Sequence, residues 1–219
     1  MSRMDELIAL LLPATGETLL MVAVPTAFSC ALGLVVGVVL VATEPGGLVP
    51  ASILHRALGA LVNVTRSVPF IILMVAIVPL TRLLVGTSIG TLAAMVPLVV
   101  AAIPYVARLV ETGLKEVPQG ITDALIAMGA TPFQIIRHGW LSEAWPALIR
   151  GATLTAISLV SYSAMAGAVG GGGLGDLAVR YGYQRMRTDV MLATVLVLLV
   201  LVQGLQFLGE RLASRLDRR

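Results

Sequence analysis

The run of residues between Glu17 and Glu44 constrains the fold most, because it is apolar and holds no charged side chain. A helix needs about 20 apolar residues to cross the hydrocarbon core of a membrane, and this run is long enough to cross with some tilt. Charged residues make up 12% of the chain and hydrophobic residues 58%, whereas soluble domains carry roughly 25% charged residues. A soluble core of this size cannot bury so much apolar sequence. Much of the chain must therefore lie in lipid.

Four more apolar stretches follow, separated by turn signals or polar segments. The EPGG turn at 44–47 and the GTSIG turn at 86–90 separate the first three stretches, and the polar segment 119–142 precedes the fourth. The GGGG run at 170–173 ends the fourth stretch, since no regular spanning helix holds that sequence. We therefore expect an all-α polytopic membrane protein, a single transmembrane domain over residues 1–219, with five spanning helices at residues 18–43, 57–84, 89–108, 146–169 and 190–209.

Basic residues between the helices predict the orientation. Five spans place the two termini on opposite sides of the membrane, and cytoplasmic segments carry an excess of Lys and Arg. With the C-terminus in the cytoplasm, the basic residues favour that side by about two to one. The inside then holds Arg56, Arg66, Arg108, Lys115, Arg137, Arg150, Arg211, Arg215, Arg218 and Arg219, and the outside holds Arg3, Arg82, Arg180, Arg185 and Arg187. This places the N-terminus outside and the 119–142 loop inside.

The 119–142 loop has the pattern of two short helices that meet at Gly129. Gly129 suits the position just after a helix end, where a positive φ is needed. Thr131 can cap the second helix, with Pro132 as its first residue and Gln134 completing a capping box. The pattern indicates a helix–glycine–helix unit that a partner protein can bind; an amphipathic helix lying on the membrane surface is the alternative. Apolar residues of the first helix share one face: Ile121, Ala124, Leu125 and Met128.

This loop resembles the EAA loop of bacterial ABC-importer permeases, whose pattern is E-A-A-x-x-x-G and, after nine further residues, I-x-L-P. The first part of the pattern is matched by Asp123, Ala124, Leu125 and Gly129. The second part is matched by Gly139, Leu141 and Ser142. Asp replaces Glu, Leu replaces the second Ala, Gly replaces Ile and Ser replaces Pro. The missing proline bears on the exit angle into the fourth span, where Pro146 is a substitute.

The resemblance extends over nearly the whole chain. Four segments are similar to the permease subunits of methionine importers: TRSVPFIILM, AAIPYVARLVE, ITDALIAMGATPFQIIRHGWLSEAWPALI and SYSAMAGAVGGGGLGDLAVRYGYQR. The EAA pattern alone indicates only the superfamily, and the last segment points to the methionine branch. This resemblance implies the ABC type I importer permease fold and a five-span subunit of a bacterial inner-membrane transporter that moves D- and L-methionine by alternating access.

The same resemblance implies the partners. We expect a homodimer in membrane lipid, two copies of a cytoplasmic ATP-binding subunit that carry ATP and Mg²⁺, and a periplasmic or lipid-anchored substrate-binding protein. This chain is then not an enzyme and binds no cofactor, metal or nucleic acid itself. The glycine run at 170–173 is not followed by Lys-Ser/Thr, so it is not an ATP-binding P-loop, and a tight turn on the outer side is the better interpretation.

Three groups of residues are candidates for function. Coupling to the ATPase is assigned to Asp123, Ala124, Leu125, Met128, Gly129, Ala130 and Arg137. The translocation pathway is assigned to Tyr162, Ser163 and Met165, because a pathway needs weak, partly polar contacts and Met is polarizable. Close packing of helices by small residues is the alternative for these three. Arg66 is a gate or an anchor at the membrane interface.

Three other functions compete with this interpretation. A permease for another amino acid or small nutrient has the same general features. A secondary transporter or channel predicts charged groups at mid-membrane and often an inverted repeat, and the sequence shows neither. An intramembrane enzyme needs an acid, lysine or histidine near mid-depth to activate a serine or tyrosine, and the spans offer none.

Overall fold

The computed structural model describes residues 3–216, which form helices, turns and loops and no strand. Arg218 and Arg219, which we expect on the cytoplasmic side, lie outside the described residues. The elements in chain order are α1 (Arg3–Ala42), α2 (Ser52–Ser67), α3 (Phe70–Ala76), α4 (Val78–Val85), α5 (Thr91–Lys115), α6 (Gln119–Ala127), α7 (Pro132–Gln134), the π-helix η1 (Ile135–Trp140), α8 (Leu141–Ala166), the π-helix η2 (Gly167–Gly171), α9 (Gly173–Leu177), the π-helix η3 (Ala178–Tyr183) and α10 (Thr188–Leu216).

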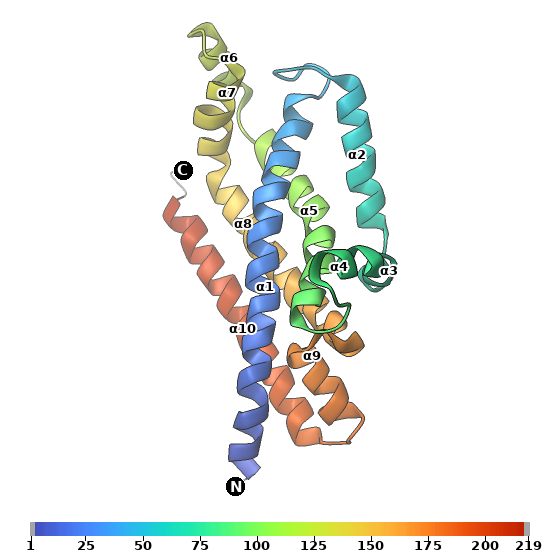
Figure 1. The fold of residues 1–219 in the computed structure, drawn as a ribbon. Coiled ribbons are helices and arrows are strands. Elements are labelled where there is room, and N and C mark those ends of the chain that lie inside the picture. The colour runs from blue at the N-terminus through green and yellow to red at the C-terminus, as the bar shows by residue number, and fades with distance from the viewer. Residues whose placement is uncertain (1–2, 217–219) are drawn as a thin grey trace.

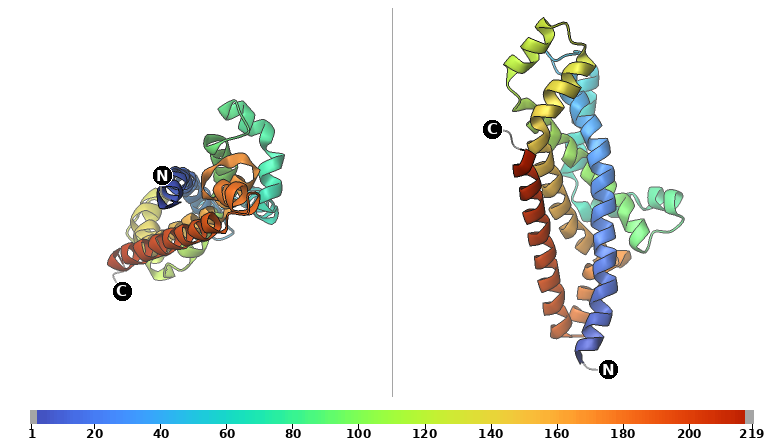
Figure 2. Two further views of the ribbon diagram at one scale, coloured as in Figure 1. Left: turned by 90° about the horizontal axis from the view of Figure 1, so that it is seen from below. Right: turned by 90° about the vertical axis from the view of Figure 1, so that its left-hand side faces the viewer.

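The long helices lie side by side along one axis of an elongated molecule (Figure 1). Helix α6 lies at one end, here called the α6 end, and the N-terminus lies at the other, beside the turn from η3 into α10. Helix α10 returns toward the α6 end, while the segment around α4 projects sideways near mid-height (Figures 1 and 2). The two termini therefore point in opposite directions, as an odd number of crossings requires.

The all-α membrane fold predicted from the sequence is confirmed. Within residues 3–216, four helices are long and apolar enough to cross a membrane, and the bent α2–α3 pair makes a fifth if it is counted as one broken span. Helix α10 buries little of its surface within the chain, since only 11% of its most apolar window is buried. Its free face must meet lipid or another copy of the chain. The four helical segments are Met4–Ala42, Thr91–Lys115, Pro132–Gly171 and Thr188–Leu216.

The second predicted span, 57–84, is not one helix, and that prediction is wrong in this respect. Helix α2 ends at Ser67 because Val68 precedes a proline and is extended, with φ −85° and ψ 126°. Helix α3 leaves at 106° to α2. The apolar content of the stretch was recognised from the sequence, but Pro69 redirects the chain within it.

The helices also extend beyond the predicted limits of the other spans. Helix α1 starts at Arg3 and not at residue 18, and α5 continues to Lys115, past the predicted end at residue 108. The fourth helical segment runs from Pro132 to Gly171 instead of 146–169, and α10 covers residues 188–216 instead of 190–209. A charged residue marks the edge of an apolar run, but a helix continues past it when the side chain finds a polar partner.

Glu17 of α1 is an example of a charged side chain with such a partner. Its carboxylate accepts a hydrogen bond from the Gly173 backbone N–H at 2.6 Å, and the Thr18 hydroxyl accepts one from the Leu174 N–H at 2.8 Å. These bonds attach α1 to the start of α9. The predicted tight turn at 170–173 is confirmed, since Gly170, Gly172 and Gly173 all have positive φ.

Two glycines bring α1 and α5 into close contact. A Cβ atom added at Gly33 would lie 2.6 Å from the Val106 Cβ, and one at Gly37 would lie 2.6 Å from the Val110 Cβ. The two glycines are four residues apart and so lie on the same face of α1. Small residues at this spacing let two helix backbones approach closely in a membrane.

Replacing Gly37 with leucine should therefore destabilise the protein by about 2 kcal/mol, because the side chain cannot be placed without separating α1 from α5. The measurement is the fraction of monodisperse protein that survives heating in detergent. Gly16→Ala is the matched control, since a Cβ atom at Gly16 meets nothing within 4 Å. Equal heat resistance of the two variants would contradict the close α1–α5 packing.

Candidate functional site

The 119–142 loop folds as two helices joined at Gly129. Helix α6 ends at Ala127, and Gly129 has φ +78°. The Gly129 N–H then donates to the Ile126 carbonyl at 2.9 Å. Thr131 caps the next helix: the Thr131 N–H donates to the Gln134 Oε1 at 2.8 Å, and the Gln134 N–H donates to the Thr131 hydroxyl at 3.4 Å. The capping box predicted from the sequence is confirmed.

The second helix of the loop is not short. Helix α7 continues through η1 into α8, so the chain leaves the loop as one helical segment from Pro132 to Gly171. Pro146 lies inside α8. Ser142, which stands where the EAA pattern has proline, lies in the first turn of α8, and no break occurs there. A displacement of the loop therefore reaches α8 through continuous helix.

Helix α6 packs against η1 around Gly139. The Trp140 Nε1–H donates to the Thr122 hydroxyl at 3.0 Å, and both side chains are buried. A Cβ atom at Gly139 would lie 2.7 Å from the Leu125 Cδ1 and 3.6 Å from the Ile121 Cγ2. The departure from the family pattern at Gly139 thus makes room for Leu125. This contact fixes the angle of α6 to the rest of the molecule.

The four apolar residues predicted on one face of α6 differ in their exposure. Ile121 and Leu125 are half-buried and lie against Gly139, whereas Ala124 and Met128 are exposed. Thr122 is the buried residue of α6, and it lies on the side that bonds with Trp140.

The exposed side of the loop is apolar at the extreme α6 end of the molecule. Three large apolar side chains are mostly exposed there: Ile126 at 55%, Phe133 at 68% and Met128 at 74%. We call these three residues the apolar tip. Ile126 and Phe133 are not among the residues predicted from the sequence, although a phenylalanine next to Pro132 in the first turn of a capped helix is a signal that could have indicated the second. Exposed apolar groups of this kind mark a protein or membrane contact.

The remaining members of the predicted coupling group differ in their surroundings. Asp123 is exposed and accepts a hydrogen bond from the Gln119 side chain at 3.4 Å. Ala130 is half-buried and Arg137 is exposed. Arg137 also lines a groove of about 470 Å³ between the end of α5, the start of α8 and the end of α10, together with Glu116, Trp145 and Arg150.

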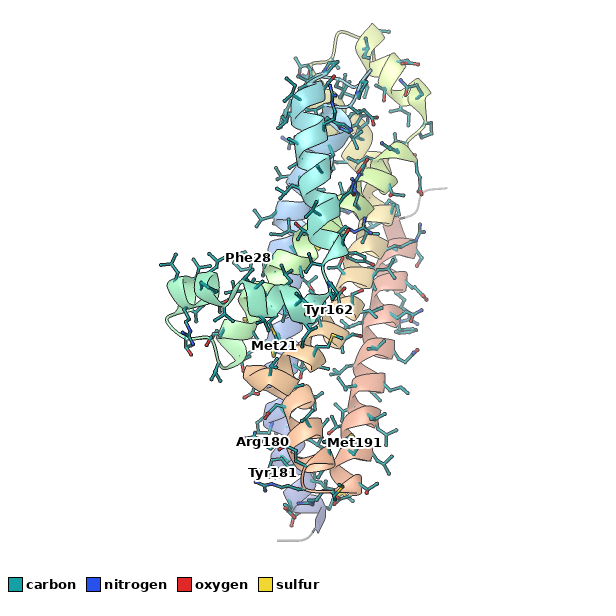
Figure 3. The ribbon with its side chains drawn as sticks, turned by 90° about the vertical axis from the view of Figure 1, so that its right-hand side faces the viewer. Met21, Phe28, Tyr162, Arg180, Tyr181 and Met191 are labelled. Carbon is teal, nitrogen blue, oxygen red and sulfur yellow. The ribbon has the colours of Figure 1, made fainter. Side chains whose placement is uncertain are left out.

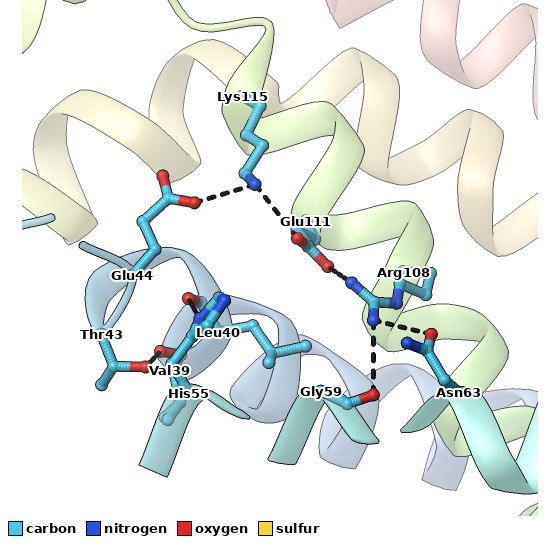
Figure 4. A network of polar contacts seen from close by, with 10 residues as sticks. All are labelled: Val39, Leu40, Thr43, Glu44, His55, Gly59, Asn63, Arg108, Glu111 and Lys115. Carbon is cyan, nitrogen blue, oxygen red and sulfur yellow. Dashed lines mark hydrogen bonds and ion pairs between the residues drawn. The ribbon is translucent and has the colours of Figure 1, made fainter. Parts of the chain in front are cut away.

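A polar network joins three elements just before the loop (Figure 4). Arg108 and Glu111 of α5 form an ion pair. The Arg108 guanidinium also donates to the Asn63 Oδ1 of α2 at 2.8 Å. The Lys115 ammonium lies 3.1 Å from Glu111 and 2.8 Å from Glu44, in the α1–α2 connection. The network holds the last turns of α5 to α2 and to the end of α1. The charged residues Arg108, Glu111 and Lys115 are visible in the sequence, but their partners are not.

The three predicted pathway residues of α8 face different surroundings. The Tyr162 ring stacks on Phe70 of α3, with ring centroids 4.7 Å apart and an angle of 7° between the planes. Ser163 is buried, and its hydroxyl donates to the Val160 carbonyl at 2.7 Å. Met165 is 47% exposed. Tyr162 lies near mid-height, far from Arg180 and Tyr181 at the N-terminal end (Figure 3). Phe70, the partner of Tyr162, was not predicted.

The fold and this loop match a known family. Residues 31–219 match the model of the binding-protein-dependent transport system inner membrane component family. The chain belongs to this family. The resemblance inferred from the sequence is thereby confirmed, and the departures at Asp123, Gly139 and Ser142 are variations on its loop.

Two relatives of this permease in the family carry methionine in their names. This permease is 56% identical over 210 residues to the probable D-methionine transport system permease protein MetI of Vibrio cholerae. The matched region covers 96% of this chain and 93% of the relative. It is also 50% identical over 163 residues to the D-methionine transport system permease protein MetI of Escherichia coli K12. That matched region covers 74% of this chain and 75% of the relative.

Solved structures agree with the permease fold. A chain from a crystal form of the MetNI methionine ABC transporter, in an inward-facing conformation, superposes with a TM-score of 0.96 at 47% identity over 100% of both chains. A chain of an amino acid ABC transporter solved with histidines superposes with a TM-score of 0.79 at 15% identity, covering 97% of this permease and 96% of that chain. The second likeness concerns the fold alone. The ABC importer permease fold predicted from the sequence is confirmed.

Proposed function

We propose that this permease is the membrane subunit of an ATP-driven importer that moves methionine, in its D and L forms, into the cell. The observation that carries the proposal is the full-length match to a permease chain of a methionine ABC transporter, with a TM-score of 0.96 at 47% identity. The 56% identity to a probable D-methionine permease agrees with it. In this arrangement ATP is hydrolysed by a partner ATPase, which carries the ATP and Mg²⁺, and this chain hydrolyses nothing.

The proposed assembly has two copies of this chain, two ATPase subunits and one substrate-binding protein. The little-buried apolar face of α10 favours a neighbour in the membrane, either lipid or the second copy. We place the N-terminus outside and the C-terminus and the α6 end in the cytoplasm, because the basic residues favour that side by about two to one. The ATPase then meets the α6 end.

The ATPase binds the exposed side of the 119–142 loop in this account. The apolar tip supplies contact area, while Asp123 and Arg137 supply charge that fixes the register. Leu125 acts from inside the loop, since it holds α6 against Gly139. Gly129 and Ala130 form the turn between the two helices.

Movement of the loop reaches the pathway by two routes. One is the helical segment that begins at Pro132 and includes Tyr162 and Met165. The other is α5, which the polar network attaches to α2, and α2 leads to Phe70 and its stacking partner Tyr162. Ser163 serves in packing, because its hydroxyl is bonded to its own helix. Both routes converge on the Phe70–Tyr162 pair.

Purification in mild detergent and uptake competition test the proposal together. An ATPase that co-purifies with this chain is expected, and its absence would favour a stand-alone transporter. Unlabelled methionine should inhibit uptake of labelled methionine at micromolar concentration, while glutamine and histidine should not. If glutamine or histidine competes and methionine does not, the chain is a permease for another amino acid.

A further inference from the structure

Arg66 lies deep along α2, far from the polar level at which that helix begins. The His55 Nδ1 lies 2.9 Å from the Leu40 carbonyl of α1, which aligns the two helices at that level. Eleven residues along α2 from His55 correspond to about 16 Å at 1.5 Å per residue. Along α1, the distance from Leu40 to Glu17 corresponds to about 35 Å. Since α2 runs alongside α1 (Figure 1), Arg66 lies about halfway between the two polar levels.

This depth revises the placement of Arg66 at the membrane interface. The hydrocarbon core is about 30 Å thick, so the guanidinium starts from a backbone position near its middle. A charged side chain at that depth faces water or an anion, because exposure to lipid is costly. Helix α2 ends one residue after Arg66, just before the Pro69 break.

Arg66 continues a polar stripe on one face of α2. Gly59, Asn63 and Arg66 are spaced at i, i+4 and i+7, which places them on the same helical face. The Gly59 carbonyl and the Asn63 side chain both accept hydrogen bonds from Arg108. The stripe therefore extends the polar network from the α6 end toward mid-depth.

Arg66 has no partner within this stripe. Its side chain is exposed, and among residues 3–216 it makes no hydrogen bond or ion pair. Arg108 of α5, in contrast, is held by Glu111, Asn63 and Gly59. Arg66 thus lies on the same face beyond the inner end of the network, and its donors are available to another molecule.

Aromatic and thioether groups lie on the next segments. Phe70 follows Arg66 by four residues, just beyond the break, and stacks on Tyr162 at 4.7 Å. Met165 is exposed three residues further along α8. A guanidinium pairs with a carboxylate through two parallel hydrogen bonds, and apolar, polarizable groups suit an unbranched apolar side chain. Together they suit an amino acid of that kind.

We propose that Arg66 pairs with the carboxylate of the amino acid as it crosses the permease. This role rests on the proposed function as an amino-acid importer and adds a specificity residue to it. The apolar side chain of the substrate then lies toward the Phe70–Tyr162 pair and Met165.

The test uses the complete transporter in vesicles, with this chain, its ATPase and its binding protein. Arg66→Gln should slow methionine uptake by about 10- to 100-fold, which is the expected loss for a charge-assisted pair. Arg66→Lys should lose less, because it keeps the charge but not the planar fork. ATP hydrolysis stimulated by the binding protein should stay within about twofold of wild type, since the ATPase contacts are unchanged.

Arg56→Gln is the matched control. Arg56 is exposed on the same helix, and its Nε–H donates to the Ser52 carbonyl at 3.2 Å near the start of α2. Uptake by this variant should equal wild type. Wild-type uptake rates in Arg66→Gln, or a parallel loss of uptake and ATP hydrolysis, would overturn the proposal.

A thiol at position 66 separates the charge from folding. Arg66→Cys is made in a Cys30→Ala background and treated with a cationic or a neutral methanethiosulfonate reagent. The cationic reagent should restore uptake at least about fivefold over the neutral one, which an assembly defect would not allow. No reaction of the thiol with either water-soluble reagent would contradict a water-facing Arg66. If the wild-type transporter carries another amino acid, the substrate in the proposed function is wrong, and the Arg66 variants are assayed with that amino acid.

Discussion

Replacing Gly129 with valine should lower ATP-driven uptake about tenfold or more while the protein still inserts in the membrane. Gly129 has φ +78°, a conformation that costs ordinary residues roughly 1–2 kcal/mol and β-branched residues more. A Cβ atom at Gly129 meets nothing within 4 Å, so the effect comes from the backbone and not from a steric overlap. The turn should relax and move the apolar tip out of position. Uptake and ATP hydrolysis are measured together in vesicles.

Two variants separate this conformational effect from the loss of a glycine in general. Gly129→Asn should retain much more uptake, because asparagine tolerates the left-handed conformation. Gly120→Ala should match wild type, since Gly120 is helical and a Cβ atom there meets nothing within 4 Å. If Gly129→Val transports as well as Gly120→Ala, the geometry of this turn has no part in coupling.

Replacing Glu111 with leucine should have the second largest effect, a loss of about 3 kcal/mol of stability. Glu111 is buried and contacts both Arg108 and Lys115, so its removal leaves the half-buried Arg108 without its counter-charge, while Lys115 keeps Glu44. We expect the thermal midpoint in detergent to fall by roughly 6–12 °C, in proportion to that loss.

The double variant Glu111→Leu with Arg108→Met tests whether the ion pair is the cause. Replacing both members of a buried pair by apolar residues of similar size is often close to neutral. The double variant should therefore be more stable than Glu111→Leu alone. If the two changes simply add, Glu111 acts through packing and the network does not hold α5 to α2 electrostatically.

Local rules predicted the 119–142 loop well. The Thr131–Gln134 capping box and the positive φ of Gly129 each depend on a few neighbouring residues, so the sequence was sufficient. The split of the α6 surface was not predicted. It depends on the Trp140–Thr122 hydrogen bond and on the room left by Gly139, which are contacts across the loop.

Apolar content located the membrane segments but not their shape. Residues 57–84 are apolar enough to suggest one span, and a break at Pro69 was not predicted. Helix α3 leaves α2 at 106° and packs beside α8 through Phe70 and Tyr162. The bond between Arg108 and Asn63 joins residues 45 positions apart. Pairs at such a separation depend on helix packing and are not readable from spacing.

Accumulation of methionine in vesicles is the direct test of ATP-driven import by this permease. The vesicles contain this permease with its ATPase, ATP is supplied on the ATPase side, and labelled methionine with the binding protein is supplied on the other. The methionine concentration inside the vesicles should exceed the concentration outside only when ATP is present. It should stop rising when the ATPase is inactivated. Passive equilibration without ATP, or accumulation driven by an ion gradient alone, would contradict it.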